Sequence, residues 1–164
     1  MATQAWPSAS LRSVVWLGGA AWLAYLKKPE GGSVLSVRTD TIGWVGGGLL
    51  LSGLAFHLWS NVSLARGEGA TGATPTMPVV EGPYRYVRNP IYLAGIPLLL
   101  GTYMLYLKWS IVDLIPAVVL LAFFHLRVVR SEEPELRRRF GTAYEDYCRR
   151  VPRWIPRFGS VGQK

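Results

Sequence analysis

The sequence predicts an all-α integral membrane protein with about four transmembrane helices and a cytoplasmic, amphipathic C-terminal helix. Half of the 164 residues are hydrophobic and only 17% are charged, whereas about a quarter of the residues of a typical soluble domain are charged. The apolar residues also gather into runs that are too long for strands. A soluble globular enzyme is therefore not expected, and residues 1–164 are predicted to form a single membrane domain.

The first two apolar runs predict spans at about residues 11–28 and 41–65. The first run is short, because a helix needs about 20 residues to cross the hydrocarbon core, and a cleaved signal peptide is the competing interpretation. The second run is long enough to span with some tilt. It holds two small-xxx-small pairs, which predict close approach of a neighbouring helix. These pairs are Gly43 with Gly47 and Gly48 with Ser52.

The next two apolar runs predict an antiparallel pair of spans at about residues 91–107 and 110–130. Only Lys108 and Trp109 separate the two apolar runs, and so short a connection favours a helical hairpin. After Arg130 the sequence turns polar, but apolar side chains still recur at helical spacing. They are Leu136, Phe140, Tyr144, Tyr147 and Val151. Since the arginines lie largely elsewhere on the helical wheel, this segment is predicted to be an amphipathic helix at the membrane face.

The charges predict orientation and partners. Four spans place both termini on one side, and most lysines and arginines fall on that side, so both termini are expected in the cytoplasm, with the protein in the inner (plasma) membrane. The net charge of +8 suits an anionic lipid surface, and nucleic acid is not expected as a partner. The single Cys148 excludes an internal disulfide, and no metal site is expected because C-x-x-C motifs and His clusters are absent.

Two polar segments, 66–90 and 131–158, are predicted to meet at the cytoplasmic face and to build a site there. In the first segment, Gly82 and Pro83 predict a turn before the third span. Asn89 then stands at the helix N-cap and Pro90 in the first turn, where each residue type is favoured. The exposed amides of such a helix start would favour an anionic group.

In the second segment, Glu132 and Glu133 stand at the cytoplasmic end of the fourth span. Ionisable residues at a membrane boundary are costly and mark functional sites. An alternative interpretation is that the two acids only favour the N-terminus of the amphipathic helix.

The run GPYRYVRNPIYLAG, together with SEEPELRRRFGTAYEDYCRRVPRWIP, resembles the isoprenylcysteine carboxyl methyltransferase family and its relatives, the phospholipid N-methyltransferases. The resemblance is dense from about Met77 to Pro156. It implies a transferase, specifically an S-adenosylmethionine-dependent methyltransferase, integral to the membrane. The methyl group of S-adenosyl-L-methionine would pass to a lipophilic acceptor that is either isoprenylcysteine carboxylate-like or phospholipid amine-like.

The family pattern of a glycine, a tyrosine and R-H-P-x-Y falls on Gly82, Tyr84 and residues 88–92, with Asn89 in place of the histidine. The family's EExxL falls on Glu132, Glu133 and Leu136. The cofactor-binding residues that the resemblance implies are Met77, Val79, Tyr84, Arg88, Asn89, Pro90, Tyr92, Glu132 and Glu133. The catalytic residues that it implies are Arg127, Arg130 and Glu133. Two arginines are named because the family's substrate-contacting arginine falls on Val128, which both of them flank.

The chemistry of these residues fits that activity. A carboxylate such as Glu132 can accept hydrogen bonds from the ribose or the ammonium group of the cofactor, and the ring of Tyr84 or Tyr92 can face a sulfonium cation. A carboxylate acceptor would be oriented by an arginine. An amine acceptor would instead have to lose a proton, for which Glu133 is the candidate base.

Two other classes of protein remain open. The run YCRRVPRWIP also resembles the C-terminal end of sterol reductases, which implies an NADPH-dependent membrane reductase. The third class is a non-catalytic membrane protein. Cofactor binding separates the three classes, since S-adenosylhomocysteine would stabilise the first, NADPH the second, and neither compound the third.

Overall fold

The structure is a computed structural model that describes Gly18 and residues 38–69, 77–106 and 115–158. Within these ranges the chain forms helices, turns and irregular segments and contains no strand, which confirms the all-α class. The chain divides into two compact units. Unit 1 contains Met1–His57 and Ala94–Asp113, and unit 2 contains Leu58–Leu93 and Leu114–Lys164.

Helix α2, Thr41–Gly69, contains the predicted span 41–65. Asp40 precedes it, and its Oδ1 atom accepts a hydrogen bond from the backbone N–H of Gly43 at 2.9 Å, as a helix N-cap does. By length and composition alone, Thr41–Gly67 can cross a membrane. The sequence therefore identified this helix and its approximate bounds correctly.

The other expected spans have less support. Pro90–Tyr106 is apolar but shorter than a span. Residues 11–28 lie outside the described residues apart from Gly18, as does the connection at Lys108 and Trp109. The predicted helical hairpin therefore stays a prediction.

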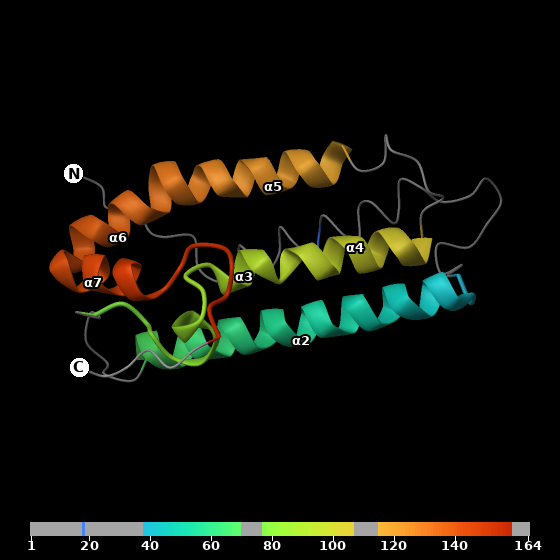
Figure 1. Cartoon of the computed structure of the whole chain (residues 1–164), viewed down its shortest axis with the longest axis horizontal. Coiled ribbons are helices and arrows are strands. Elements are labelled where there is room, and N and C mark those ends of the chain that lie inside the picture. The colour runs from blue at the N-terminus through green and yellow to red at the C-terminus, as the bar shows by residue number, and fades with distance from the viewer. Residues whose placement is uncertain (1–17, 19–37, 70–76, 107–114, 159–164) are drawn as a thin grey trace. The chain divides into compact units, whose positions relative to one another are not determined.

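In unit 1, α4 (Gly95–Tyr106) lies alongside the first part of α2 (Figure 1). A Cβ atom at Gly46 would come within 2.8 Å of a side chain of α4, and one at Gly53 within 2.9 Å of its backbone. A Cβ atom at Gly101 of α4 would come within 2.5 Å of the backbone of α2. Small residues thus let the helices approach. The pairs named from the sequence do not make this contact, because Gly47 and Gly48 have no described atom within 4 Å of the Cβ position.

The third predicted run, 91–107, is two helices in the structure. Helix α3, Pro90–Leu93, ends at a turn at Ala94, and α4 follows. Pro90 occupies the first turn of α3 as predicted, and the carbonyl of Asn89 accepts the N–H of Leu93 at 3.0 Å. Asn89 therefore stands at the N-cap position that its sequence context predicted.

In unit 2, the helix that begins as α5 continues without a break into the polar region (Figure 1). Helix α5, Ile115–Arg127, passes through a π-helical turn, η3 (Val128–Glu132), into α6 (Glu133–Phe140). Gly141, with φ of 53°, ends α6, and α7 (Thr142–Arg150) follows. The predicted single amphipathic helix is thus two helices, since this left-handed conformation breaks the helix and favours glycine.

The apolar stripe predicted for this region forms a core in unit 2. Tyr144, Tyr147 and Val151 are buried, and three half-buried side chains pack against them. These three are Leu136, Phe140 and Cys148.

The predicted turn at Gly82 and Pro83 is the start of a 3-10 helix, η1 (Gly82–Arg85). The φ of Gly82 is 55°, and a Cβ atom there would collide with Ser63 and lie 3.3 Å from the indole nitrogen of Trp59. Glycine is therefore needed for both the conformation and the close approach to α2.

Candidate functional site

Unit 2 brings together polar residues from the two segments that the sequence singled out. The hydroxyl of Tyr92, on α3, donates a hydrogen bond to Oε1 of Glu132, on η3. The same oxygen accepts a hydrogen bond from Nε of Arg127 at 3.3 Å. Glu132 is only 5% exposed, so its charge is balanced inside the protein rather than by water.

The π-helical turn explains how Arg127 reaches Glu132. The two residues are five positions apart, and a π turn places residues i and i+5 one above the other. Arg130, the other arginine left open by the sequence, is exposed. Of the two, Arg127 is the one that the structure joins to the glutamate pair.

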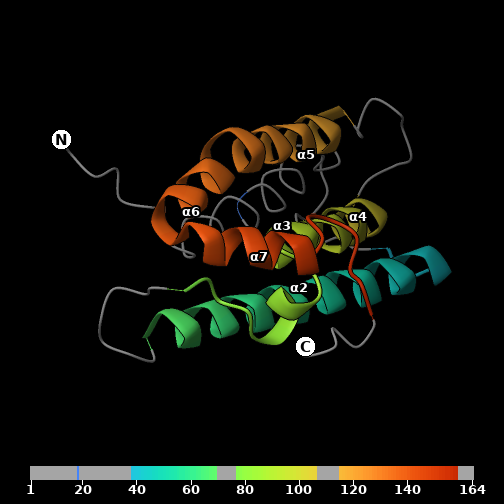
Figure 2. The ribbon, with the colours of Figure 1, turned by 60° about the vertical axis from the view of Figure 1, so that its left-hand side comes forward.

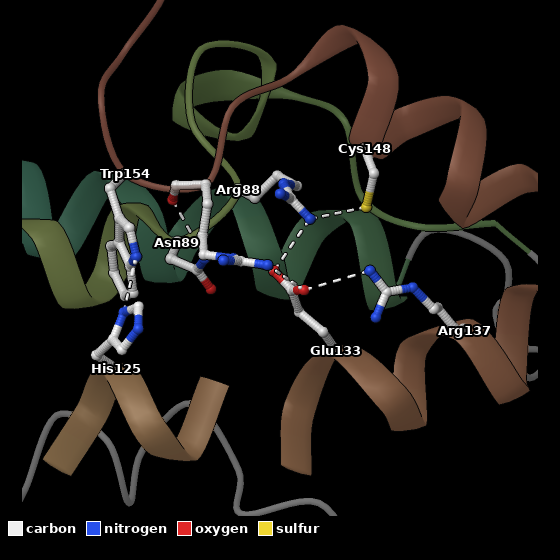
Figure 3. Close-up of polar contacts among 8 residues, drawn as sticks. Arg88, Asn89, His125, Glu133, Arg137, Cys148 and Trp154 are labelled. Atoms are coloured by element: carbon white, nitrogen blue, oxygen red, sulfur yellow. Dashed lines mark hydrogen bonds and ion pairs between the residues drawn. The ribbon is translucent and has the colours of Figure 1, made fainter. Parts of the chain in front are cut away.

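Glu133 lies at the centre of three arginines from three parts of unit 2 (Figure 3). Arg153 donates two hydrogen bonds to its carboxylate, from Nε to Oε1 at 2.6 Å and from Nη2 to Oε2 at 2.8 Å. Arg88 donates to Oε1 at 3.0 Å, and Arg137 lies 3.4 Å from Oε2. The residue is 2% exposed, and its partners provide more positive charge than the carboxylate cancels.

This surrounding keeps Glu133 ionised. Burial alone would raise the pKa of the carboxyl group, because it disfavours the charged form. The hydrogen bonds from Arg153 and the positive charges of Arg88, Arg153 and Arg137 outweigh burial, so the pKa of Glu133 lies below its ordinary value. The pKa of Arg153 is raised, chiefly by its hydrogen bonds to Glu133.

Arg88 also contacts Cys148 of α7, which packs against the apolar core of unit 2. Its Nη1 atom, which contacts Glu133, also lies 2.8 Å from Sγ of Cys148 (Figure 3). Its Nε atom is buried and has no hydrogen-bond partner within the described part of the chain. A buried donor without a partner is costly, which suits a ligand that brings an acceptor atom.

Residues 151–158, called the C-terminal segment below, run beside α3 and the residues before it (Figures 1 and 2). The backbone N–H of Arg88 donates to the carbonyl of Pro152 at 2.9 Å, and the N–H of Arg157 donates to that of Tyr86 at 3.1 Å. The Asn89 side chain donates from Nδ2 to the carbonyl of Arg153 at 3.2 Å. The Asn89 side chain is therefore hydrogen-bonded to the C-terminal segment.

A second side chain of the C-terminal segment reaches α5. The indole N–H of Trp154 donates to Nδ1 of His125 at 3.2 Å, and the two ring centroids are 5.8 Å apart (Figure 3). Trp154 therefore packs against His125 of α5.

The remaining residues implied by the resemblance are dispersed over the same unit. Tyr84 is buried, and its carbonyl accepts the hydroxyl of Tyr147 at 2.8 Å. Pro90 is buried at the start of α3. Met77 is exposed, and the side chain of Val79 lies so close to Gly67 that a Cβ atom there would come within 2.6 Å of it.

Sequence reasoning missed three side chains of this cluster. Arg137 lies one turn after Glu133, and this i,i+4 spacing could have identified it. Cys148 follows the buried Tyr147 in the apolar stripe and gave no sign of a polar contact. Arg153 lies 20 positions from its partner Glu133, so nothing in its spacing could have indicated the contact.

Comparison with known proteins identifies the family. The model of the phospholipid methyltransferase family matches residues 41–143, and the chain belongs to that family. Over 78 residues it is 41% identical to the protein-S-isoprenylcysteine O-methyltransferase of Schizosaccharomyces pombe. The matched segment covers 48% of this chain and 32% of that relative, so the chain corresponds to about a third of the relative's length. These findings confirm the resemblance drawn from the two motifs.

Proposed function

We propose that the chain is an S-adenosylmethionine-dependent methyltransferase of a membrane, with a lipophilic methyl acceptor. The family to which it belongs and the relative it resembles are both named for methyl transfer. The observation that carries the proposal is the cluster in unit 2, where Tyr92 and Arg88 from one motif contact Glu132 and Glu133 from the other. Two distant motifs that meet at buried charges are typical of a binding site.

The residues present fit the proposed cofactor. When bound, S-adenosylmethionine supplies an electrophilic methyl group on a sulfonium sulfur. The buried Nε atom of Arg88, which has no hydrogen-bond partner among the described residues, suits an acceptor such as a carboxylate. Glu132 suits ribose hydroxyls or an ammonium group, and the tyrosine rings suit a cation. The residues proposed to hold the cofactor are Met77, Val79, Tyr84, Arg88, Asn89, Pro90, Tyr92, Glu132 and Glu133.

The arginines around Glu133 indicate which chemical class of methyl acceptor suits the site. A carboxyl group with a lowered pKa accepts a proton poorly, and a base works best with a pKa near the operating pH. Glu133 is therefore better suited to hold its neighbours in place than to deprotonate an amine. This favours a carboxylate acceptor, which needs no base. The exposed Arg130 and the half-buried Arg127 are the candidates to orient it, and positioning then supplies much of the barrier reduction.

We also propose four spans with both termini in the cytoplasm, in the inner (plasma) membrane. The family name and the apolar helix Thr41–Gly67 support a membrane location, and the basic residues support the orientation. Reporters placed after Lys164 and near Gly72 should both report the cytoplasm, and one near Gly32 the opposite side. A reporter near Gly72 on the side opposite Lys164 would contradict this arrangement, because the two motif segments could not meet.

Ligand binding by the detergent-purified protein tests the proposed cofactor. S-adenosylhomocysteine should raise the unfolding temperature of the parent, and NADPH should not. Replacing Glu132 by Gln should weaken S-adenosylhomocysteine binding by about ten-fold to a hundred-fold, as the loss of a charged hydrogen bond predicts. The matched control is Glu135→Gln, because the Glu135 side chain is half-exposed and its ion pair among the described residues is with Arg138 at the surface. Stabilisation by NADPH would instead favour a reductase, and stabilisation by neither compound a non-catalytic protein.

A further inference from the structure

The C-terminal segment lies outside the part of the chain that the family model matches. The match ends at residue 143, ten residues before Arg153. The segment nevertheless runs beside the first motif, joined by backbone hydrogen bonds of Arg88 with Pro152 and of Arg157 with Tyr86. The family match alone therefore does not assign what this segment does at the site.

Arg153 joins the C-terminal segment to both motifs at once. Its guanidinium group makes two hydrogen bonds to the two oxygens of Glu133, at 2.6 and 2.8 Å, and such bidentate pairs fix orientation as well as adding energy. Its carbonyl accepts the Nδ2 hydrogen of Asn89 at 3.2 Å. One residue thus contacts the first motif through its backbone and the second through its side chain.

We propose that Arg153 is a positioning residue of the candidate methyl-transfer site, which holds the Glu133 carboxylate in one orientation and the Asn89 amide in another. The proposal rests on the function proposed above. Because one N–H of the Asn89 amide donates to the carbonyl of Arg153, the orientation of the amide is set, and its oxygen and second N–H are what this side chain can offer to a ligand. Asn89 stands where the family has histidine, so its orientation matters to what this chain binds.

Neither Arg88 nor Arg137 makes a bidentate contact with Glu133. Arg88 approaches one oxygen of Glu133 and shares the same nitrogen with Cys148. Arg137 is half-exposed and lies 3.4 Å from the other oxygen. A carboxylate held by these two alone would keep a positive environment but would lose its bidentate contact, and its orientation would be less restricted.

The test compares Arg153→Gln and Arg153→Lys with Arg157→Gln as the matched control. Arg157 belongs to the same segment and is exposed, and its described hydrogen bond uses only the backbone N–H. Affinity for S-adenosylhomocysteine is measured by calorimetry on the detergent-purified full chain at pH 7.5 and pH 5. Unfolding temperature reports folding, and infrared titration of Glu133, assigned with Glu133→Gln, reports its ionisation.

We expect Arg153→Gln to bind S-adenosylhomocysteine about ten-fold more weakly than the parent at pH 7.5. The deficit should widen at pH 5, because burial then raises the pKa of Glu133 with less opposition. Arg153→Lys keeps the charge but not the bidentate geometry, so it should restore the pH profile of the parent and only part of the affinity. Arg157→Gln should match the parent throughout.

The other outcomes overturn either the role proposed for Arg153 or the function on which it rests. If Arg153→Gln lowers the unfolding temperature but binds with the affinity and pH profile of the parent, Arg153 is only a structural residue and the proposal fails. If infrared titration gives the same pKa for Glu133 in Arg153→Gln as in the parent, the contact with Arg153 does not govern the ionisation of Glu133, and the proposal also fails. If the parent itself does not bind S-adenosylhomocysteine, the proposed function fails, and the role of Arg153 fails with it.

Discussion

Replacing Glu133 by Gln should destabilise the protein far more than a typical substitution on a polar helix. The change keeps the size of the side chain but removes the negative charge that contacts Arg88, Arg137 and Arg153. Breaking a buried ion pair on one side typically costs about 3 to 5 kcal/mol, because the remaining charge stays buried without a partner.

The magnitude follows from how buried each partner is. The side chain of Arg88 is 11% exposed. Removing the Glu133 charge would therefore leave the Arg88 charge buried with little water to solvate it. The side chains of Arg153 and Arg137 are 33% and 46% exposed, and water can solvate them in part. We therefore expect a loss near the lower end, about 3 kcal/mol, or about 6 to 12 °C in unfolding temperature for a chain of this length.

Thermal unfolding in detergent, followed by circular dichroism, measures this loss. The control is Glu135→Gln on the same helix, whose ion pair with Arg138 is exposed and should contribute less than about 1 kcal/mol. Equal unfolding temperatures for the two variants would refute the reasoning, since Glu133 would then not be held by its arginines in the folded protein.

Three further predictions concern single residues. The stability difference between the parent and Glu133→Gln should be complete above about pH 5 and should close as the pH falls below about 4.3 through the lowered pKa of Glu133; a difference that is constant down to pH 3 would contradict this. Tyr92→Phe should cost about 1.5 to 3 kcal/mol in unfolding free energy, because it removes the hydrogen bond to Glu132 but keeps the ring, and unchanged stability would exclude that bond. Gly141→Ala should cost about 1 to 3 kcal/mol, because the φ of 53° strains any side chain. Its control, the helical Gly47→Ala, should be neutral or slightly stabilising, and equal effects of the two in thermal unfolding would refute the strain.

The elements that the sequence predicted correctly are those with a strong local signal. The run 41–65 became helix α2 because it is apolar over more than the length of a span. Pro90 and Asn89 marked the start of α3 through their fixed φ and N-cap preference. The glutamate pair was identified because ionisable residues at a membrane boundary are costly and therefore mark functional sites.

What the sequence did not predict depends on backbone bonding or on distant contacts. The π turn at Val128–Glu132 has no periodic pattern of its own, yet it decides that Arg127 reaches Glu132. Gly141 lies inside a pattern that is helical on both sides, so the break in the helix was not evident. The contact of Arg153 with Glu133 arises because the chain returns after α7, which no local pattern encodes.

Transfer of a radiolabelled methyl group tests the central claim most directly. The purified parent is incubated with labelled S-adenosylmethionine and, separately, with extracted membrane lipids, a prenylated cysteine and phosphatidylethanolamine. We expect label in a lipophilic acceptor as a base-labile methyl ester, and little label with Glu132→Gln. Base-stable label on phosphatidylethanolamine would contradict the carboxylate acceptor. No label in any lipophilic fraction, from a folded protein that binds S-adenosylhomocysteine, would contradict the proposed methyl transfer to a lipophilic acceptor.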